Sequence, residues 1–293
     1  MHFSQKKGLG KMDLQDLFKE ETNIPSLPEV FYRFREAVND PDTSFYDMGE
    51  IIATDPGLTA RLLKIVNSPF YGLSNKVETI PHAVSIVGSS QLNDLVISTC
   101  IIDRFKNISP KGLDMPLFWE HSIATGLSAK IIAKQINIVN QDSIFVGGLL
   151  HDIGRLVLCL NAPEEFSEIF LEAQTEEKSL LEVEIKILGF GHDKTGEELL
   201  RRWKLPKVHQ ETIGYHHNPL AAPLFNNEAA VVFIANNLAK SLALGSSGEL
   251  IASENNGKIF NLLGIKSEEF LPSIIDKVQK EYEATLDVFL QAA

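Results

Sequence analysis

Histidine and aspartate side chains gather in the middle of the chain, inside segments that are otherwise apolar. His121 lies in a segment rich in apolar and small residues, and His151-Asp152 directly follow the apolar run 145–150. A buried carboxylate beside buried imidazoles is costly unless each polar group is paired or bound to a cation. Imidazole and carboxylate suit Zn, Fe and Mn, and such an ion polarises a phosphoryl oxygen and lowers the pKa of bound water. The pattern therefore indicates a metal pocket suited to phosphoester hydrolysis.

Three further histidines extend this candidate pocket along the chain. His216 and His217 form a pair, and His192 stands before Asp193. The segment around His192 can equally be a helix start, because Asp193 favours the positive end of a helix dipole. For each histidine taken singly, a hydrogen bond in the core or a helix cap is the alternative. That structural role is assigned to His2, His82 and His209.

A short basic run provides a weaker candidate for ligand binding. Arg201 and Lys204 flank Trp203 and carry charges that a phosphate ligand needs. The simpler interpretation is the end of a helix, with Trp203 buried and the cations solvated near the negative end of the helix dipole.

Composition excludes several classes of protein. With 293 residues, 44% hydrophobic and 23% charged, the chain has the profile of a folded globular protein rather than a disordered one. A net charge of −12 argues against broad binding to a nucleic-acid backbone. Cys100 and Cys159 show no paired spacing, which fits a reducing cytoplasm. No secretory signal is expected, and the apolar stretch 143–160 contains charges that favour a buried helix over a membrane span.

The elements expected to position these side chains are helices throughout. Apolar residues recur at helical spacing, for example from Leu58 to Val66 after the start signal Asp55-Pro56. No strand-type alternation competes convincingly. We therefore predict an all-α fold, a multi-helical bundle with an additional N-terminal helical lobe. In the second half of the chain the expected helices cover residues 117–136, 143–160, 163–174, 177–188, 193–202, 207–215 and 227–244.

The chain is predicted to contain two main parts joined by a loop. The segment 107–116 contains two prolines and a glycine and is the best candidate for the boundary. Residues 1–22 are charged and weakly patterned, and they are expected to form a flexible arm. The predicted parts are an N-terminal helical lobe at 23–106, a helical bundle at 117–245 and a C-terminal helical extension at 246–293 packed on the body.

Several motifs along the chain resemble one known family. In the first half they are Ile24-Pro25-Ser26-Leu27-Pro28, Asp55-Pro56-Gly57-Leu58-Thr59, Leu62-Leu63-Lys64-Ile65-Val66-Asn67-Ser68, Ile80-Pro81-His82-Ala83 and Ile86-Val87-Gly88. In the second half they are Trp119-Glu120-His121-Ser122, Gly148-Leu149-Leu150-His151-Asp152-Ile153-Gly154, Trp203-Lys204-Leu205-Pro206 and His216-His217-Asn218-Pro219. Together they resemble the HD-related output domains (the HDOD group), relatives of the HD phosphohydrolases and HD-GYP phosphodiesterases. The resemblance covers about residues 23 to 290 and implies an HD-like fold.

The resemblance also implies a set of metal ligands. In catalytic HD relatives a helix histidine, a His-Asp doublet and a late aspartate hold the metal, and HD-GYP enzymes add histidines for a second ion. His121, His151 and Asp152 match the first three positions. The additional histidines are matched by His192, His216 and His217. The implied cofactor is a divalent metal, Fe, Mn or Zn, or none.

The late position departs from the catalytic pattern. Asn236 stands where catalytic relatives have aspartate, and a neutral amide oxygen is a poorer ligand for a divalent cation. The Gly-Tyr-Pro loop of the HD-GYP group is also missing, because Gly214-Tyr215 is followed by His216. The resemblance therefore implies a non-catalytic regulatory module of bacterial signalling more strongly than an enzyme.

Our leading hypothesis is a cytoplasmic bacterial signal-transduction module that binds signalling proteins, with a nucleotide or phosphate ligand as a second kind of partner. Neither a membrane nor a nucleic acid is expected as a partner. The alternative is a metal-dependent phosphohydrolase or phosphodiesterase in which Asn236 and the additional histidines compensate for the missing aspartate. A third class is a purely structural all-α protein.

Overall fold

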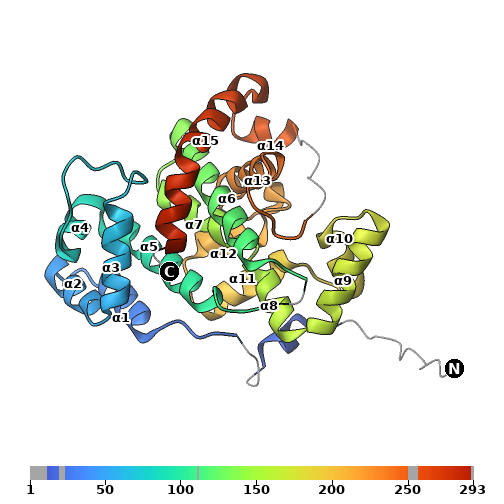
Figure 1. Cartoon of the computed structure of the whole chain (residues 1–293), viewed down its shortest axis with the longest axis horizontal. Helices are drawn as coiled ribbons and strands as arrows, with labels where there is room; N and C mark the ends of the chain where they lie inside the picture. Colours follow the sequence, from blue (N-terminus) through green and yellow to red (C-terminus); the bar gives the residue numbers. More distant parts are fainter. Residues whose placement is uncertain (1–11, 20–23, 111, 250–256, 292–293) are drawn as a thin grey trace.

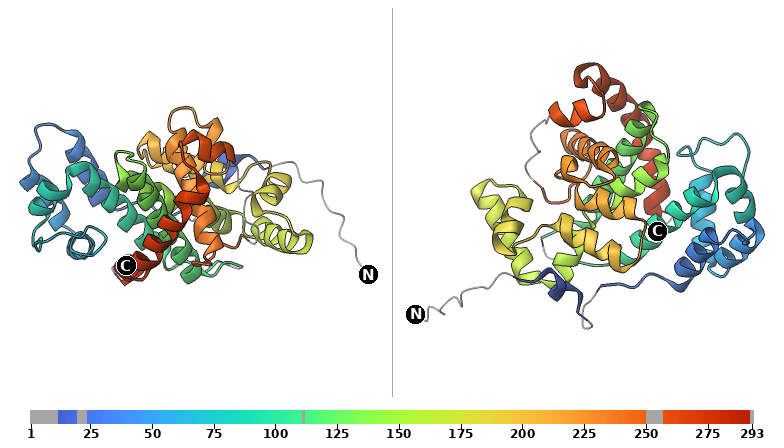
Figure 2. Two further views of the ribbon diagram at one scale, coloured as in Figure 1. Left: turned by 90° about the horizontal axis from the view of Figure 1, so that it is seen from above. Right: turned by 180° about the vertical axis from the view of Figure 1, so that it is seen from behind.

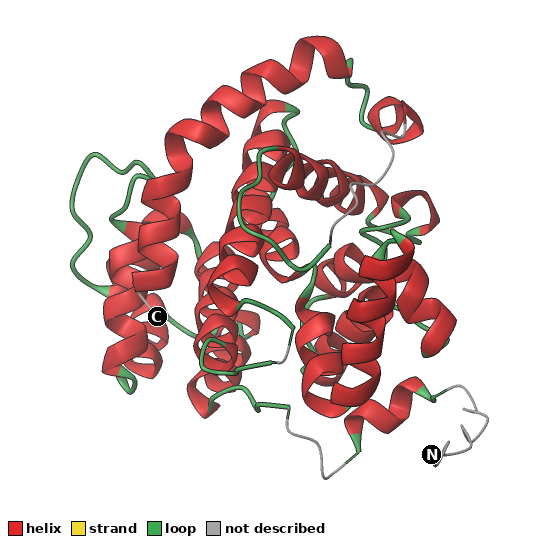
Figure 3. Ribbon diagram, turned by 45° about the vertical axis from the view of Figure 1, so that its right-hand side comes forward, coloured by secondary structure: helices red, strands yellow, loops and turns green. Residues whose placement is uncertain are grey.

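The chain folds into helices joined by loops (Figure 1), and the computed structural model describes residues 12–19, 24–110, 112–249 and 257–291. No strand occurs within these ranges (Figure 3), which confirms the predicted all-α fold. The elements are η1 (Leu14–Phe18), α1 (Glu29–Asn39), α2 (Phe45–Ala53), α3 (Pro56–Val66), α4 (Ile80–Val87), α5 (Ser89–Phe105), α6 (Met115–Gln135), α7 (Gln141–Leu150), α8 (Ile153–Asn161), α9 (Pro163–Glu176), α10 (Leu180–Ile187), α11 (His192–Arg202), α12 (Lys207–Gly214), η2 (Pro219–Ala221), α13 (Asn226–Ser241), α14 (Gly257–Leu262) and α15 (Ser267–Gln291).

Several helices begin where a capping side chain precedes a proline. Asp55 before α3, Thr79 before α4 and Asp114 before α6 each accept a hydrogen bond from a backbone N–H of the first turn. Proline follows in the first turn of each helix, where its missing N–H removes no intrahelical hydrogen bond. The helix start predicted at Asp55 is confirmed. Helix α6 begins two residues before the expected position because Asp114 supplies the cap.

Helices α1 to α5 form an N-terminal lobe, on the left in Figure 1. Its last helix, α5, runs into the body and packs on α7. The loop after α3 places Phe70 against Phe145 of α7 and Phe289 of α15, with ring centroids 4.9 and 5.5 Å apart. One continuous apolar core therefore connects the lobe with the body. The boundary predicted at 107–116 does not separate two cores, because the inner faces of the lobe are buried against the bundle.

The body is built around α6, which contacts α7, α13 and α15. A second apolar core fills the space between α6, α13, α14 and α15. Helix α15 crosses the body so that its C-terminal end lies near the N-terminal lobe (Figures 1 and 2). Helices α9 and α10 form a hairpin on the opposite side of the body from that lobe (Figures 1 and 2).

The single helix predicted at 143–160 is wrong in one respect, because the structure divides it. Helix α7 ends at Leu150 and α8 begins at Ile153, with His151 and Asp152 in the turn between them. The run Gln141–Asn161 is apolar and long enough to cross a membrane, but 89% of its most apolar window is buried inside the protein. Among the described residues the bent pair α4–α5 passes the same test, with an angle of 118° between its helices.

The flexible arm predicted at residues 1–22 is only partly open to comparison, because residues 1–11 and 20–22 lie outside the described ranges. The stretch in between is not free. Leu17 and Phe18 of η1 are buried against the body, and Arg202 donates to the Phe18 carbonyl at 3.1 Å. The expectation is therefore wrong for η1, whose two apolar side chains join the core.

Candidate metal centre

The structure brings all six predicted ligand residues together, from four different parts of the bundle. His121 lies on α6, and the doublet of His151 and Asp152 occupies the turn between α7 and α8. His192 is the first residue of α11. His216 and His217 follow the end of α12, and Asn236 on α13 lies beside His121. We call the six predicted ligands the His/Asp cluster.

Contact between glycines on α6 and α7 brings the first ligands close to one another. A Cβ atom added at Gly148 would lie 2.8 Å from the Gly126 Cα atom, so the two backbones touch. His121 precedes Gly126 by five residues, and His151 follows Gly148 by three. The close crossing therefore places these two imidazoles side by side, with ring centroids 5.3 Å apart.

A second close crossing joins α8 to α11. A Cβ atom at Gly154 would lie 2.0 Å from the His192 carbonyl oxygen and 2.7 Å from the Gly196 nitrogen. This crossing holds the start of α8 against the start of α11. Asp152, immediately before α8, consequently faces His192, with Oδ1 and Nε2 3.0 Å apart.

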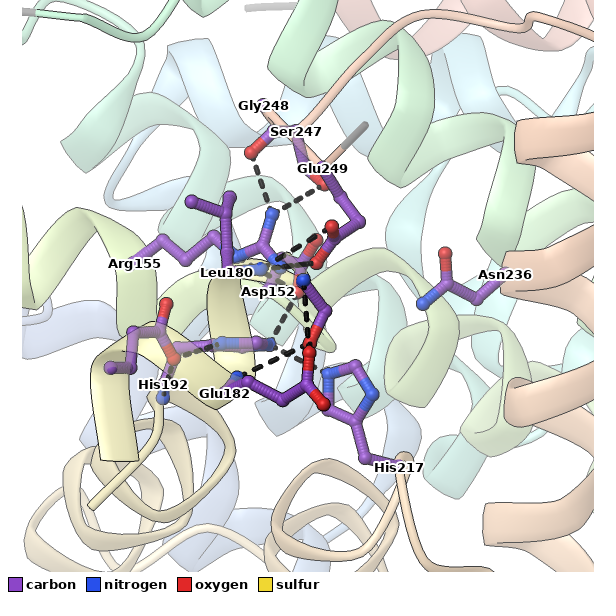
Figure 4. Close-up of polar contacts among 12 residues, drawn as sticks. Asp152, Arg155, Leu180, Glu182, His192, His217, Asn236, Ser247, Gly248 and Glu249 are labelled. Atoms are coloured by element: carbon purple, nitrogen blue, oxygen red, sulfur yellow. Dashed lines mark hydrogen bonds and ion pairs between the residues drawn. The ribbon is translucent and has the colours of Figure 1, made fainter. Parts of the chain in front are cut away.

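Asp152 is the centre of the His/Asp cluster. Its Oδ2 atom lies 3.1 Å from Nε2 of His151, and its Oδ1 atom lies 3.8 Å from Nε2 of His216. His217 reaches the same group from the outer side, with its Nε2 atom 3.0 Å from Nε2 of His192. Figure 4 shows His192, His217 and Asp152 converging, with Asn236 standing apart from them.

Local hydrogen bonds fix the orientation of two imidazoles. His151 Nδ1 donates to the Gly148 carbonyl at 2.7 Å, and His216 Nδ1 donates to the Ile213 carbonyl at 2.7 Å. In both rings the other nitrogen, Nε2, is thereby left as a lone-pair donor that points into the cluster. This is the tautomer that a metal-binding histidine uses.

His121 is held in a different way. Its Nε2 atom lies 3.1 Å from Oδ1 of Asn236, and because an amide oxygen only accepts, the proton of the ring sits on Nε2. Its Nδ1 atom is buried without a hydrogen bond. The amide at the late position therefore keeps a proton on the His121 nitrogen that faces it, and a protonated ring nitrogen has no lone pair to offer an ion.

Burial and charge set the protonation states of the cluster. Burial lowers the pKa of His121 to about 3 and the pKa of His216 well below its usual range. Burial alone would raise the pKa of Asp152, but Arg155, His151 and His192 outweigh it and hold that pKa well below its usual range. His121 and His216 are thus held as neutral imidazoles and Asp152 as a carboxylate, which are the forms that bind metal.

His192 behaves differently because it lies between two carboxylates. Burial alone would lower the pKa of His192, but Glu184, with Asp152, outweighs it and raises that pKa to about 9. Glu184 Oε2 lies 2.6 Å from His192 Nδ1. No sequence pattern singles out Glu184, which is one of several charged residues in its segment.

A buried arginine also went unpredicted as part of the site. The Arg155 guanidinium is fully buried, with Nε 3.6 Å from Oδ1 of Asp152 and Nη2 3.5 Å from Glu249. Its Nη1 donates to the carbonyl and hydroxyl of Ser247 at 2.7 and 2.9 Å (Figure 4). We call residues 245–249 the strap. The only signal for Arg155 was its charge inside an apolar run.

Unsatisfied buried atoms test whether the cluster fits a metal ion. Nε2 of His151, Nε2 of His216 and both carboxylate oxygens of Asp152 are buried without a hydrogen bond. Such groups are costly to bury, and a divalent cation would satisfy all four atoms. Two overlapping sets of ligand atoms within 4.8 Å of one another are present: His121, His151 and Asp152, and Asp152, His192, His216 and His217. The residues fit a metal, and Asp152 belongs to both sets.

Arg201 and Lys204, the weaker ligand candidates, do not join the cluster. Arg201 pairs with Glu198 and has a side chain that is 58% exposed. It lies near the far end of α11, about 14 Å along the helix from His192. The predicted burial of Trp203 is confirmed, at 7% exposure. This geometry agrees with the interpretation of a helix end rather than a phosphate site.

The structural role assigned to His209 is consistent with its surroundings. His209 is fully buried, and its Nε2 atom lies 3.2 Å from Oδ1 of Asp94 on α5. It therefore joins α12 to α5, away from the His/Asp cluster. His82 belongs to neither ligand set. His2 lies outside the described residues.

Comparison with known proteins supports the resemblance to the HDOD group that the sequence motifs indicate. The HDOD domain family model matches residues 24–219. An uncharacterized protein of Treponema pallidum (strain Nichols) is 28% identical over 266 residues, which is 89% of this chain and 50% of that protein. The chain therefore spans about half the length of this curated relative.

Solved structures share the fold over nearly the whole chain. An HDOD domain protein of unknown function from Geobacter sulfurreducens is 26% identical, with a TM-score of 0.76, and the match covers 94% of this chain and 97% of that one. A candidate phosphohydrolase from Shewanella amazonensis SB2B is 24% identical, with a TM-score of 0.73 and coverage of 95% and 98%. The second likeness concerns the fold alone. Because the family model matches well over half of the residues, the chain belongs to the HDOD domain family.

Proposed function

We propose that this chain is a non-catalytic, metal-binding module of bacterial signal transduction that acts by binding protein partners. The observation that carries the proposal is the hydrogen bond between Asn236 and His121, which engages a ligand nitrogen with a neutral amide. The proposal includes a cytoplasmic location, which the two free and buried cysteines, Cys100 and Cys159, support.

The two ligand sets differ in the donor groups that they contain. The set of His121, His151 and Asp152 has lost its fourth, anionic ligand at Asn236, which lowers its affinity for a cation. The set of Asp152, His192, His216 and His217 keeps one carboxylate and three imidazoles, a donor set that suits Zn, Fe or Mn. A metal bound there supplies Lewis-acid chemistry and structural support. Of these two contributions, we expect the structural support to be the one that matters for the function of the module.

The enclosure of the cluster favours a regulatory role over turnover. His121, His151, Asp152, His192 and His216 are each at most 1% exposed. A phosphodiester must reach both the ion and a bound water, and His217, which is partly buried, is the one member of the cluster that is open to solvent. An enclosed donor set is instead typical of metals that stabilise a fold.

A metal-dependent phosphohydrolase is the second candidate, and one observation favours it. The four orphaned atoms of His151, Asp152 and His216 point toward one another, as the ligands of a working centre do. In that case Asp152 and the histidines would hold the ion, and Arg155 would hold Asp152 in its ionised form.

Hydrolysis of a phosphodiester separates the two candidates. We expect purified protein loaded with Mn²⁺ or Fe²⁺ to hydrolyse bis-p-nitrophenyl phosphate no faster than the His151→Ala variant. The variant is the matched background, because it removes a ligand that both candidates share. Metal-dependent turnover that His151→Ala abolishes would establish the phosphohydrolase and overturn the regulatory proposal.

Restoring the late carboxylate should strengthen metal binding. In Asn236→Asp a carboxylate takes the position that now contacts His121, adding one negative ligand to the set that contains His151 and Asp152. We expect the Mn²⁺ affinity of that set to rise about tenfold or more, since ligand charge tunes affinity. Calorimetric titration measures the change. Asn237→Asp, on the adjacent position of α13, is the control, and equal affinities in the two variants would contradict the prediction.

A further inference from the structure

Glu184 on α10 is not one of the predicted ligands, yet its carboxylate accepts two hydrogen bonds from one of them, His192. Its Oε2 atom accepts a hydrogen bond from the His192 backbone N–H at 2.7 Å and from His192 Nδ1 at 2.6 Å. The Glu184 side chain is 1% exposed, so water does not compete for these bonds. The pair fixes the ring of His192 with Nε2 directed at Asp152.

His192 differs from the other imidazoles in where its support comes from. His151 and His216 donate from Nδ1 to carbonyls three residues earlier in the chain, so their own helices orient them. Among the histidines with a hydrogen-bonded Nδ1 in the described ranges, His192 alone is oriented by a side chain from another helix. The position of α10 therefore decides whether His192 can serve as a ligand.

The first turn of α10 is tied to the same centre by a second route. The Leu180 N–H donates to the two Glu249 carboxylate oxygens at 3.1 and 3.3 Å (Figure 4). Glu249 also pairs with Arg155, which lies beside Asp152. Both connections, through His192 and through the strap, end at the carboxylate that the two ligand sets share.

Apart from these connections, α10 packs chiefly on α9, and α9 packs on α8. The α9–α10 hairpin lies at the edge of the body (Figure 2), and Leu171 and Ile185 on it are 68% and 49% exposed. A change in the position of this hairpin would move Glu184 without disturbing the crossing of α6 and α7.

We propose that Glu184 is a positioning residue that couples the α9–α10 hairpin to metal occupancy of the Asp152, His192, His216 and His217 set. This rests on the proposed function, in that the set must bind an ion. Because coupling is reciprocal, an ion at the set orders the hairpin, and a partner that displaces the hairpin weakens the ion. The order of the hairpin thus depends on whether the set holds an ion, and a partner that binds the hairpin can distinguish the two states.

The test compares wild-type protein with Glu184→Gln, which keeps an acceptor oxygen and removes the charge, and with Glu184→Ala, which removes both. Titration with Co²⁺, followed by its visible absorption, measures the affinity and geometry of each site. We expect Glu184→Gln to weaken the His192-containing set 10- to 100-fold, Glu184→Ala to weaken it further, and the His121-containing set to change less than about twofold. A purely structural role of Glu184 would weaken both sets alike.

Hydrogen exchange provides a second readout, which follows the hairpin rather than the ion. In wild-type protein, Co²⁺ should slow amide exchange in α10 at least about fivefold, and Glu184→Gln should remove this protection. Glu172→Gln is the matched control, since Glu172 lies on the same hairpin but pairs with Lys186 at the surface. Intact Co²⁺ binding with unprotected α10, or unchanged affinity in Glu184→Gln, overturns the coupling and leaves the proposed function standing. Wild-type protein that binds no ion overturns both.

Discussion

Replacing Asp152 with asparagine is expected to abolish divalent-metal binding to the whole His/Asp cluster. Asp152 is the one residue that belongs to both ligand sets, and it provides their shared negative charge. Changes in residues that merely support a ligand typically cost 10- to 100-fold in affinity, so loss of this carboxylate should cost more than about 100-fold at each set. Metal content of protein purified without chelators, together with Mn²⁺ titration, measures the loss.

Asp94→Asn is a matched control for this experiment. Asp94 is a buried aspartate that pairs with a buried histidine, His209, at 3.2 Å, but neither residue belongs to a ligand set. Asp94→Asn should therefore retain wild-type metal content although it alters a buried contact between an aspartate and a histidine. If Asp152→Asn bound metal as well as Asp94→Asn does, the cluster would not be a metal site.

Gly154→Ala should destabilise the fold strongly. The new Cβ atom would lie 2.0 Å from the His192 carbonyl oxygen and 2.7 Å from the Gly196 nitrogen. Both are backbone atoms, so relief requires α8 and α11 to separate. Overpacking of a core typically costs 1–3 kcal/mol, and a clash between two backbones should reach about 3 kcal/mol or more. Urea denaturation monitored by circular dichroism measures the free energy of unfolding.

The same substitution should also impair the site, because Asp152 and His192 stand at the two sides of this crossing. Gly257→Ala, at the start of α14, serves as the control, since an added Cβ atom there meets nothing within 4 Å. We expect the free energy of unfolding of that variant to lie within about 0.5 kcal/mol of the wild-type value. Equal stability of the two variants would show that α8 and α11 do not cross as closely as described.

The helices and the residues of the His/Asp cluster could be predicted from local pattern. Capping residues such as Asp55 and Thr79 mark helix starts wherever they occur, and polar residues such as His151 stand out in an apolar run. The contacts that complete the centre could not be predicted in this way. Glu184 meets His192 across eight residues, and Arg155 meets Ser247 across 92. Nothing local distinguishes these carboxylates and hydroxyls from those that face solvent.

The turn at His151 and Asp152 was missed for a related reason. Apolar residues continue at helical spacing on both sides of the doublet, and no proline or capping motif interrupts them. The regular helix is interrupted there beside Gly154, where α8 crosses α11 at backbone contact, and such a contact arises only when the helices pack. Tertiary contact, rather than propensity, decides this element boundary.

Because of the two glycine crossings, substitutions in the apolar core and the geometry of the His/Asp cluster are largely independent. At Gly148 and Gly154 the distance between ligand-bearing helices is set by backbone atoms in contact, not by the volume of intervening side chains. Leucine, isoleucine and valine elsewhere in the core can therefore exchange during evolution with little effect on the spacing of the donor atoms. Changes in the apolar core and changes at the late position, Asn236, can therefore occur independently, because neither alters the backbone contacts that set the spacing of the donor atoms.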